Sequence, residues 1–303
     1  MFAIHAPAKV NLYLHVGPAR PDGRHPLDSL VVFADQRAAD RLIYHSGESS
    51  LDFTVSGPGA GHHIRPEHEN LVIRAVRALE HASGRRIGGE LHLEKQLPIA
   101  AGIGGGSSDA AATLRLLNAA CQLGFSEADL MKLAVPLGGD VPACVAGRPV
   151  LMRGDGDRVE PFMGELPELH AVLVCPAHPC PTGPVFRAFD AQESPHIFAE
   201  ILPPSSSGYT DFVAALTADY RNDLQGSAVE LVPQIGDALK ALSDCEGAGV
   251  FAMSGSGATC YALFETDEQA RLACHHLKAE NPTAWVVQTR LGEAGFDPTG
   301  FSL

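Results

Sequence analysis

The 303-residue sequence lacks an excess of positive charge, long apolar runs and paired cysteines. It holds 22 Lys and Arg against 36 Asp and Glu, and the net charge of −14 argues against nucleic acid or an anionic membrane as a partner. No window approaches the roughly 18 apolar residues of a membrane span, and residues 1–14 lack the pattern of a signal peptide. The seven scattered cysteines include no C-x-x-C pair, so we expect free thiols rather than a disulfide framework or a zinc site. These absences leave a cytoplasmic enzyme or ligand-binding protein, and a local basic pocket for a small anion is compatible with them.

The order of predicted elements favours an α+β fold. Hydrophobic residues make up 45% of the chain, enough for a sizeable core. Strand-like and helix-like segments follow one another without a βαβ rhythm, which argues against a doubly wound sheet. A second half begins near Gly154, so we expect domains at 1–153 and 154–303. Strands are predicted at 2–16 with a break at Pro7, 30–45, 88–101, 147–154, 169–176, 249–264 as a pair and 284–291; a loop at 56–70; and helices at 70–84, 107–124, 126–138, 208–223, 226–242 and 267–280.

The segment LPIAAGIGGGSSDAA, residues 97–111, is the strongest local signal. It places four glycines between a predicted strand and a predicted helix. Unpaired N–H groups and a partial positive charge at a helix N-terminus attract anions. Glycines let a phosphate approach those groups without a Cβ in the way. The segment therefore predicts a phosphate-binding loop.

Two common phosphate motifs do not fit this segment. A Walker A loop needs a Lys after its glycines, and none follows here. The dinucleotide fingerprint needs an acid at the end of a second strand about 20 residues on, where this sequence predicts a helix start. A tight turn that only packs a helix on a strand is the alternative that a lone glycine cluster leaves open.

Three motifs together resemble the GHMP kinase superfamily, which includes galactokinase, homoserine kinase and mevalonate kinase. They are APAKVNLYL at 6–14, the glycine segment, and MSGSGATCYALF at 253–264. The resemblance implies a two-domain α+β fold, with an N-terminal domain like domain 2 of ribosomal protein S5 and a ferredoxin-like C-terminal domain. It also implies an active site in the cleft between them, ATP and Mg²⁺ as cofactors, and phosphoryl transfer to an alcohol. The third motif is expected to pack behind the phosphate loop.

Further segments resemble one subfamily of these kinases: RPDGRHPLDS at 20–29, HENLVIRA at 68–75, LGGDVPACV at 137–145, PTGPVF at 181–186 and YRNDLQ at 220–225. That likeness implies a substrate with a cytidine diphosphate group, 4-diphosphocytidyl-2-C-methyl-D-erythritol, phosphorylated on its 2-hydroxyl on the methylerythritol phosphate route to isopentenyl diphosphate. It implies Lys9 and Asp140 as the catalytic pair. A carboxylate can accept the hydroxyl proton, and a neighbouring lysine can keep that carboxylate ionised.

The same likeness assigns ligand contacts. His25 would read the cytosine edge and Phe186 would stack on the base. Asn11, two residues after Lys9 on a strand, should face the same side as Lys9 and position the acceptor with Thr182. The subfamily has an aromatic residue before the loop histidine where this chain has Arg24, whose guanidinium can stack on a base or lie in solvent. The implied ATP contacts are Asn70, Pro98, Ile99, Ala100, Ala101, Gly102, Ile103, Gly104, Gly105, Gly106, Ser107 and Ser108, with Ser108 also a candidate Mg²⁺ ligand.

Two alternatives remain at this point: another GHMP kinase, of homoserine or mevalonate type, or a non-catalytic sensor with the same fold. The D-G-x-H loop and Phe186 argue against the first, and the presence of both Lys9 and Asp140 argues against the second. In each case we expect a small-molecule ligand, no nucleic acid and no membrane, and a monomer or weak homodimer.

Overall fold

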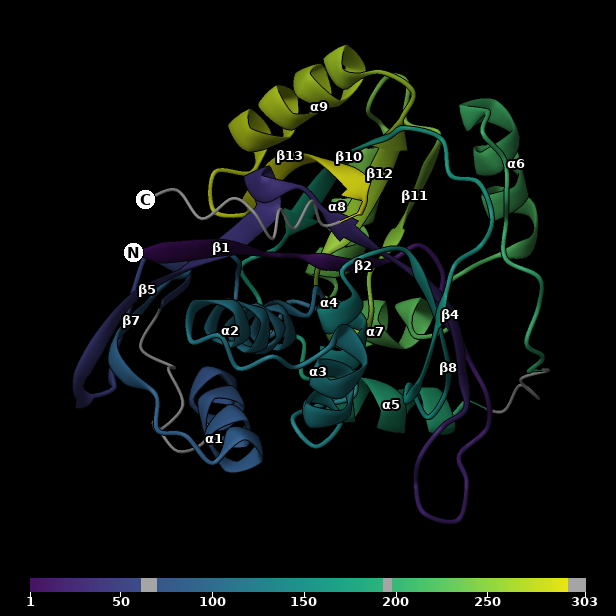
Figure 1. Cartoon of the computed structure of the whole chain (residues 1–303). Helices are drawn as coiled ribbons and strands as arrows, with labels where there is room; N and C mark the ends of the chain where they lie inside the picture. The colour runs from purple at the N-terminus through teal and green to yellow at the C-terminus, as the bar shows by residue number, and fades with distance from the viewer. Residues whose placement is uncertain (61–69, 193–197, 294–303) are drawn as a thin grey trace.

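The computed structural model describes residues 1–60, 70–192 and 198–293. It contains two largely antiparallel β-sheets (Figure 1). The first sheet has the order β1-β5-β7-β6, and the second runs β11-β12-β10-β13-β4-β8-β9, with β2 and β3 also paired to β4. The strands are β1 Phe2–Pro7, β2 Lys9–Asn11, β3 His15–Val16, β4 Leu27–Ala34, β5 Ala39–Ser50, β6 Asp52–Ser56, β7 Gly88–Glu94, β8 Val150–Gly154, β9 Arg158–Pro161, β10 Leu169–Cys175, β11 Val250–Met253, β12 Cys260–Phe264 and β13 Trp285–Gly292.

Helices cover these sheets around two hydrophobic cores. The first sheet packs against α1 and α2 in a core that includes Ala110, Ala111 and Ala112, whose small side chains let α2 lie close to β1 and β5. The second core lies between the second sheet and the C-terminal helices. The helices are α1 Leu71–Ser83, α2 Gly105–Ala120, α3 Glu127–Ala134, α4 Val141–Ala146, α5 Thr182–Asp190, α6 Tyr209–Asp219, α7 Gln225–Leu231, α8 Gln234–Ser243 and α9 Asp267–Glu280, with short 3-10 turns at Gln36–Ala38 and Pro58–Ala60.

The second sheet joins the two halves of the chain. Strand β4 bonds β8 and the end of β13 along one edge, and β2 and β3 along the other. Strand β1 belongs to the first sheet and β2 to the second, so the predicted break at Pro7 is where the chain passes between sheets. The division at 153/154 stays a prediction, and the β8–β9 hairpin spans it. Within the described ranges, no helix has the length and apolarity to cross a membrane.

The α+β expectation is confirmed, and strand β6, helix α1 and strand β7 form one parallel βαβ crossover within it. Two local expectations are wrong. The helix predicted over 226–242 is two helices, because Pro233 lacks the N–H that would continue α7 into α8. The strand predicted to reach residue 101 ends at Glu94, and α2 begins at Gly105, before the serines. Most of the loop predicted over 56–70 lies outside the described residues.

Candidate active site

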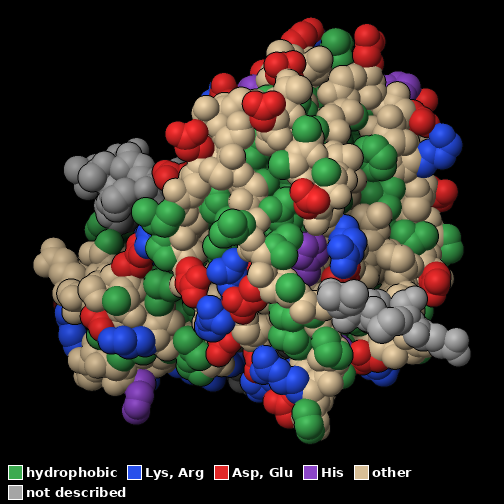
Figure 2. Space-filling model, turned by 90° about the vertical axis from the view of Figure 1, so that its right-hand side faces the viewer, with side chains coloured by type: hydrophobic (Ala, Val, Ile, Leu, Met, Phe, Trp, Pro, Cys, Tyr) green, Lys and Arg blue, Asp and Glu red, His purple; other side chains and the backbone are tan. Residues whose placement is uncertain are grey.

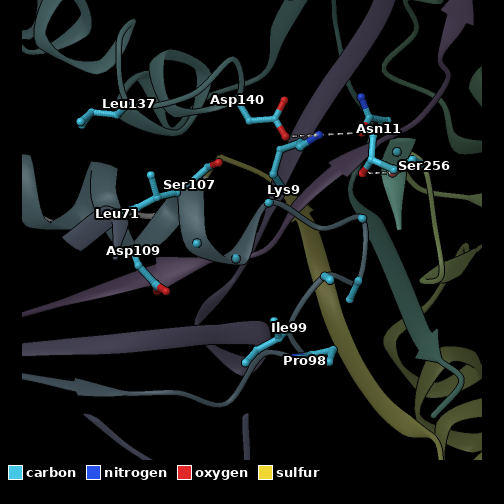
Figure 3. Close-up of a pocket in the computed structure, with 18 of the residues that line it drawn as sticks. Lys9, Asn11, Leu71, Pro98, Ile99, Ser107, Asp109, Leu137, Asp140 and Ser256 are labelled. Atoms are coloured by element: carbon cyan, nitrogen blue, oxygen red, sulfur yellow. Dashed lines mark hydrogen bonds and ion pairs between the residues drawn. The ribbon is translucent and has the colours of Figure 1, made fainter. Parts of the chain in front are cut away.

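A cavity of about 620 Å³ lies where the two halves meet. Its walls come from the glycine segment, from the catalytic candidates on β2 and the turn before α4, and from α5 and the β11–β12 turn. Figure 3 shows several of these side chains directed toward one another around the cavity. Predicted residues that line it are Lys9, Asn11, Asn70, Pro98, Ile99, Ala100, Ala101, Gly102, Gly104, Gly105, Gly106, Ser107, Asp140, Thr182 and Phe186.

The glycine segment places its backbone where side chains would block it. Gly102 and Gly104 have φ of 74° and 62°, in the left-handed region that favours glycine. A Cβ on Gly102 would lie 2.6 Å from the carbonyl oxygen of Gly257, and one on Gly104 would lie 3.2 Å from Cβ of Lys9. Gly104 then caps α2, so two further glycines occupy its first turn. The free N–H groups of that helix end therefore face the cavity without side chains in front of them.

Lys9 and Asp140 form an ion pair at the middle of the cavity. The Lys9 Nζ lies 3.1 Å from Asp140 Oδ2 and donates a hydrogen bond to Asn11 Oδ1 at 2.9 Å (Figure 3). Asn11 is held in turn by its Nδ2, which donates to Ser29 Oγ at 2.7 Å. The Lys9 side chain is 5% exposed and that of Asp140 is 37% exposed. The lysine is thus fixed by two partners while the carboxylate stays open to an incoming group.

A second cavity, of about 520 Å³, adjoins the first, and Leu27 and Phe186 line both cavities. His25 lies beside Phe186 with ring centroids 4.9 Å apart, and its Nδ1 lies 2.9 Å from the Gly17 carbonyl oxygen. Since a carbonyl can only accept, Nδ1 carries a proton, and Nε2 on the other side of the ring lies 3.5 Å from Asp190 Oδ1. The aromatic pair expected at the base end is therefore assembled in the fold.

Arg24 lines the second cavity without covering it. Its side chain is 70% exposed, and one guanidinium nitrogen lies 3.6 Å from Asp155 Oδ2. Arg20 pairs with the same carboxylate. The loop that carries Arg24 is thus held to the β8–β9 turn by ion pairs, and stacking of Arg24 on a base stays a prediction. Figure 2 shows mainly acidic side chains over the upper part of the drawn face, and acidic and basic side chains mixed in its lower part.

Comparison with known proteins bears on both halves of the chain. Residues 70–148 match the model for the GHMP kinases N terminal domain, and residues 207–283 match that for the GHMP kinases C terminal. The 4-diphosphocytidyl-2-C-methyl-D-erythritol kinase of Hyphomonas neptunium is 49% identical over 95% of this chain and 96% of its own. The 4-diphosphocytidyl-2-C-methyl-D-erythritol kinase of Caulobacter sp. is 45% identical over 95% of this chain and 97% of its own. The chain belongs to this family of GHMP kinases.

Solved structures agree with that membership. The crystal structure of a 4-(cytidine 5'-diphospho)-2C-methyl-D-erythritol kinase superposes with a TM-score of 0.77 and 35% identity, covering 96% of this chain and all of that one. Homoserine kinase from Cytophaga hutchinsonii gives a TM-score of 0.74 at 18% identity, over 98% of this chain and 96% of that one. A likeness at this identity shows the fold alone. The expected two-domain GHMP fold is confirmed, and the protein is a small-molecule kinase.

Two residues expected at the ATP end of this kinase do not line the cavity. Ile103 has a buried side chain, and the buried Ser108 donates its hydroxyl hydrogen to the Pro7 carbonyl oxygen at 2.6 Å. Asn70 lines the cavity and caps α1 by accepting from the Val72 N–H at 2.9 Å. The role of Ser108 as a Mg²⁺ ligand stays a prediction.

A buried charge cluster beside the glycine segment was not predicted. Lys95 Nζ lies 2.7 Å from Asp109 Oδ2 and also bonds Asp40, which accepts the N–H groups of Gln96 and Leu97 at 2.6 and 2.8 Å. Two carboxylates thus share one ammonium, and Asp109 Oδ1 is buried with no hydrogen-bond partner among the residues that the structure describes. Burial raises the pKa of Asp109 to about 8 against the opposing effect of Lys95. Burial lowers the pKa of Lys95, but the two carboxylates outweigh it and raise that pKa.

This cluster predicts a pH-dependent stability that Asp109→Asn removes. The raised pKa means that folded Asp109 keeps a proton that the unfolded chain loses between about pH 4 and 8. The contribution of Asp109 to the free energy of unfolding of the wild type therefore falls as pH rises through that range, and this contribution is missing in the variant. Between pH 6 and 8 we expect the free energy of unfolding of the variant to rise relative to that of the wild type by up to about 1.4 kcal/mol per pH unit. The measurement is urea denaturation of the ligand-free protein.

The matched control is Asp52→Asn, which removes an exposed acid on β6. Its difference from the wild type should stay constant over the same pH range. A constant difference for Asp109→Asn as well would contradict the raised pKa.

Proposed function

We propose that this kinase transfers the γ-phosphoryl group of ATP to the 2-hydroxyl of 4-diphosphocytidyl-2-C-methyl-D-erythritol, giving the 2-phosphate and ADP. One observation carries the proposal. The Lys9–Asp140 pair touches the phosphate-loop candidate, since a Cβ on Gly104 would lie 3.2 Å from Lys9 Cβ and 3.9 Å from Asp140 Oδ2. A base for an alcohol and a cradle for phosphate thus meet at one point of one cavity. The names of the family relatives supply the substrate.

At the phosphate end, the N–H groups of the segment from Gly102 to Gly106 bind the triphosphate oxygens. Asn70, Pro98 and Ile99 line the part of the cavity that takes the nucleoside. The donors fit an anion because they are backbone amides at a helix N-terminus, without a Cβ in front of them.

Magnesium fits the oxygen donors at this end. Ser107 and Asp140 bring a hydroxyl and a carboxylate to the cavity, the ligand class that Mg²⁺ prefers. Among the described residues no group of three or more His, Cys, Asp or Glu could hold a metal ion, which suits an ion held chiefly by phosphate oxygens. When bound, Mg²⁺ would offset the charge on the transferred group.

In the transfer step, Asp140 accepts the proton of the attacking hydroxyl. Lys9, held by Asn11, orients that carboxylate through the ion pair and stabilises negative charge on the transferred phosphoryl group. Thr182 positions the acceptor through its hydroxyl, which lies 2.8 Å from Ser256 Oγ. The cytosine lies in the second cavity, stacked on Phe186, with its edge toward the His25 ring.

Replacement of the proposed base should abolish turnover while the protein stays folded. For Asp140→Asn we expect kcat to fall by about 10²- to 10⁴-fold in a coupled ADP-release assay, because the amide cannot accept the proton. Asp244→Asn, at an exposed ion pair after α8, is the control and should keep its kcat. Equal kcat in Asp140→Asn and wild type would remove Asp140 from the mechanism.

Replacement of the proposed stacking residue should act on the acceptor alone. For Phe186→Ala we expect the KM for the cytidylyl substrate to rise about 5- to 150-fold, the loss of one base stack, with the KM for ATP unchanged. Phe162→Ala is the control, because Phe162 packs on the same core at similar burial and lines neither cavity. If both variants raise both KM values alike, Phe186 is a packing residue only.

A further inference from the structure

A chain of hydrogen bonds leads from the Lys9 ammonium into the second sheet. Lys9 Nζ donates to Asn11 Oδ1 at 2.9 Å (Figure 3). Asn11 Nδ2 donates to Ser29 Oγ at 2.7 Å, and the Ser29 hydroxyl donates to the carbonyl oxygen of Tyr13 at 2.5 Å. Ser29 lies on β4, and Tyr13 lies between β2 and β3. All four residues are at most 4% exposed, so protein groups rather than bulk water determine how these bonds are directed.

The last acceptor sets the direction of the whole chain. A carbonyl oxygen can only accept, so the Ser29 proton points to Tyr13, and Ser29 Oγ offers a lone pair to Asn11. The Asn11 amide therefore presents its N–H₂ group to Ser29 and its oxygen to Lys9. An amide turned the other way would place its N–H₂ group against the Lys9 ammonium, with two donors facing each other.

The orientation of the Asn11 amide determines how the Lys9 ammonium is held. The ammonium lies between Asn11 Oδ1 at 2.9 Å and Asp140 Oδ2 at 3.1 Å. If the amide turned over, Asp140 alone of these two partners would attract the ammonium. The ammonium would then shift toward Asp140 and away from the position in which it offsets charge on the transferred group.

We propose that Ser29 is a positioning residue for phosphoryl transfer: its hydroxyl fixes the Asn11 amide with the oxygen toward Lys9. The proposal rests on the proposed function, which places the transferred phosphoryl group at Lys9. Ser29 also lines the first cavity, so the test has to separate an action through Asn11 from a direct contact with a ligand.

The test is a double-mutant cycle on kcat, measured by coupled ADP release with Mg²⁺, ATP and the cytidylyl substrate. We expect Ser29→Ala to lower kcat about ten- to hundredfold, the effect of a lost hydrogen bond to a charged group, with both KM values within about twofold of those of the wild type. In the Asn11→Ala background, the same change at Ser29 should lower kcat less than about twofold, because no amide is left to orient. Ser29→Thr keeps the hydroxyl and suits a strand, so it should restore most of the lost kcat.

Ser227→Ala is the matched control. Ser227 is fully buried in α7 and accepts a hydrogen bond from a side-chain amide, Nε2 of Gln192 at 2.9 Å, as Ser29 does from Asn11. It lines neither cavity, so the variant should keep the kcat of the wild type although it loses the same kind of bond. A fall in kcat equal to that of Ser29→Ala would attribute the effect to a general loss of stability and overturn the inference.

The remaining outcomes each decide a distinct statement. An equal fall in kcat for Ser29→Ala in both backgrounds would show that Ser29 acts without Asn11 and would overturn the inference, as would an unchanged kcat or a rise in KM alone. If the wild type uses homoserine or mevalonate in place of the cytidylyl substrate, the proposed acceptor is overturned. The same cycle with that acceptor then decides on Ser29, because the hydrogen-bond chain ends at Lys9. If Ser29→Ala does not fold, Ser29→Cys, with a weak donor and a weak acceptor, takes its place, and its fall in kcat should likewise disappear in Asn11→Ala.

Discussion

The contact between the glycine segment and the β11–β12 turn is the constraint on which the rest of the site depends. Glycines meet glycines there: a Cβ on Gly102 would lie 2.6 Å from two carbonyl oxygens of the turn, and one on Gly255 would lie 2.7 Å from the Gly102 oxygen. The two backbones are close enough to form hydrogen bonds, and no side chain fits between them. Because one side belongs to the first half of the chain and the other to the second, the cavity exists only when both halves are folded together.

Charge is distributed to match that arrangement. The chain carries a net −14, yet its cavity contains Lys9 and Lys95, each buried and each paired with carboxylates. A buried lysine without a partner would lose its proton. Asp40 and Asp109 raise the pKa of Lys95, which places positive charge beside the proposed phosphate site, and Asp140 remains open to an incoming group. Net charge excluded nucleic acid as the expected partner without excluding a small anionic ligand.

The sequence predicted best what is encoded locally. The helix after the glycines and the break at Pro7 follow from nearby residues, and both are present. Helices α4 and α5 were missed because six and nine residues carry too little periodicity. Lys9 and Asp140 were paired only through a family resemblance, since nothing local links a strand residue to a distant turn.

The Lys95 cluster had no signature at all. Its three members lie on β5, just after β7 and in α2, and only the tertiary fold brings them together. Arg24 illustrates the opposite case, in which the departure from the family pattern is visible in sequence but its consequence depends on Asp155, a partner far along the chain.

The most direct test of the account is the rate of ADP release by the wild type with Mg²⁺, ATP and one acceptor at a time. The acceptors are 4-diphosphocytidyl-2-C-methyl-D-erythritol, homoserine and mevalonate. The cavity with its Phe186–His25 end predicts turnover with the first at a kcat/KM far above that with the other two. Turnover with homoserine or mevalonate and none with the cytidylyl substrate would contradict the assignment of the second cavity as the cytosine site. The acceptor would then be that of another branch of the GHMP kinases.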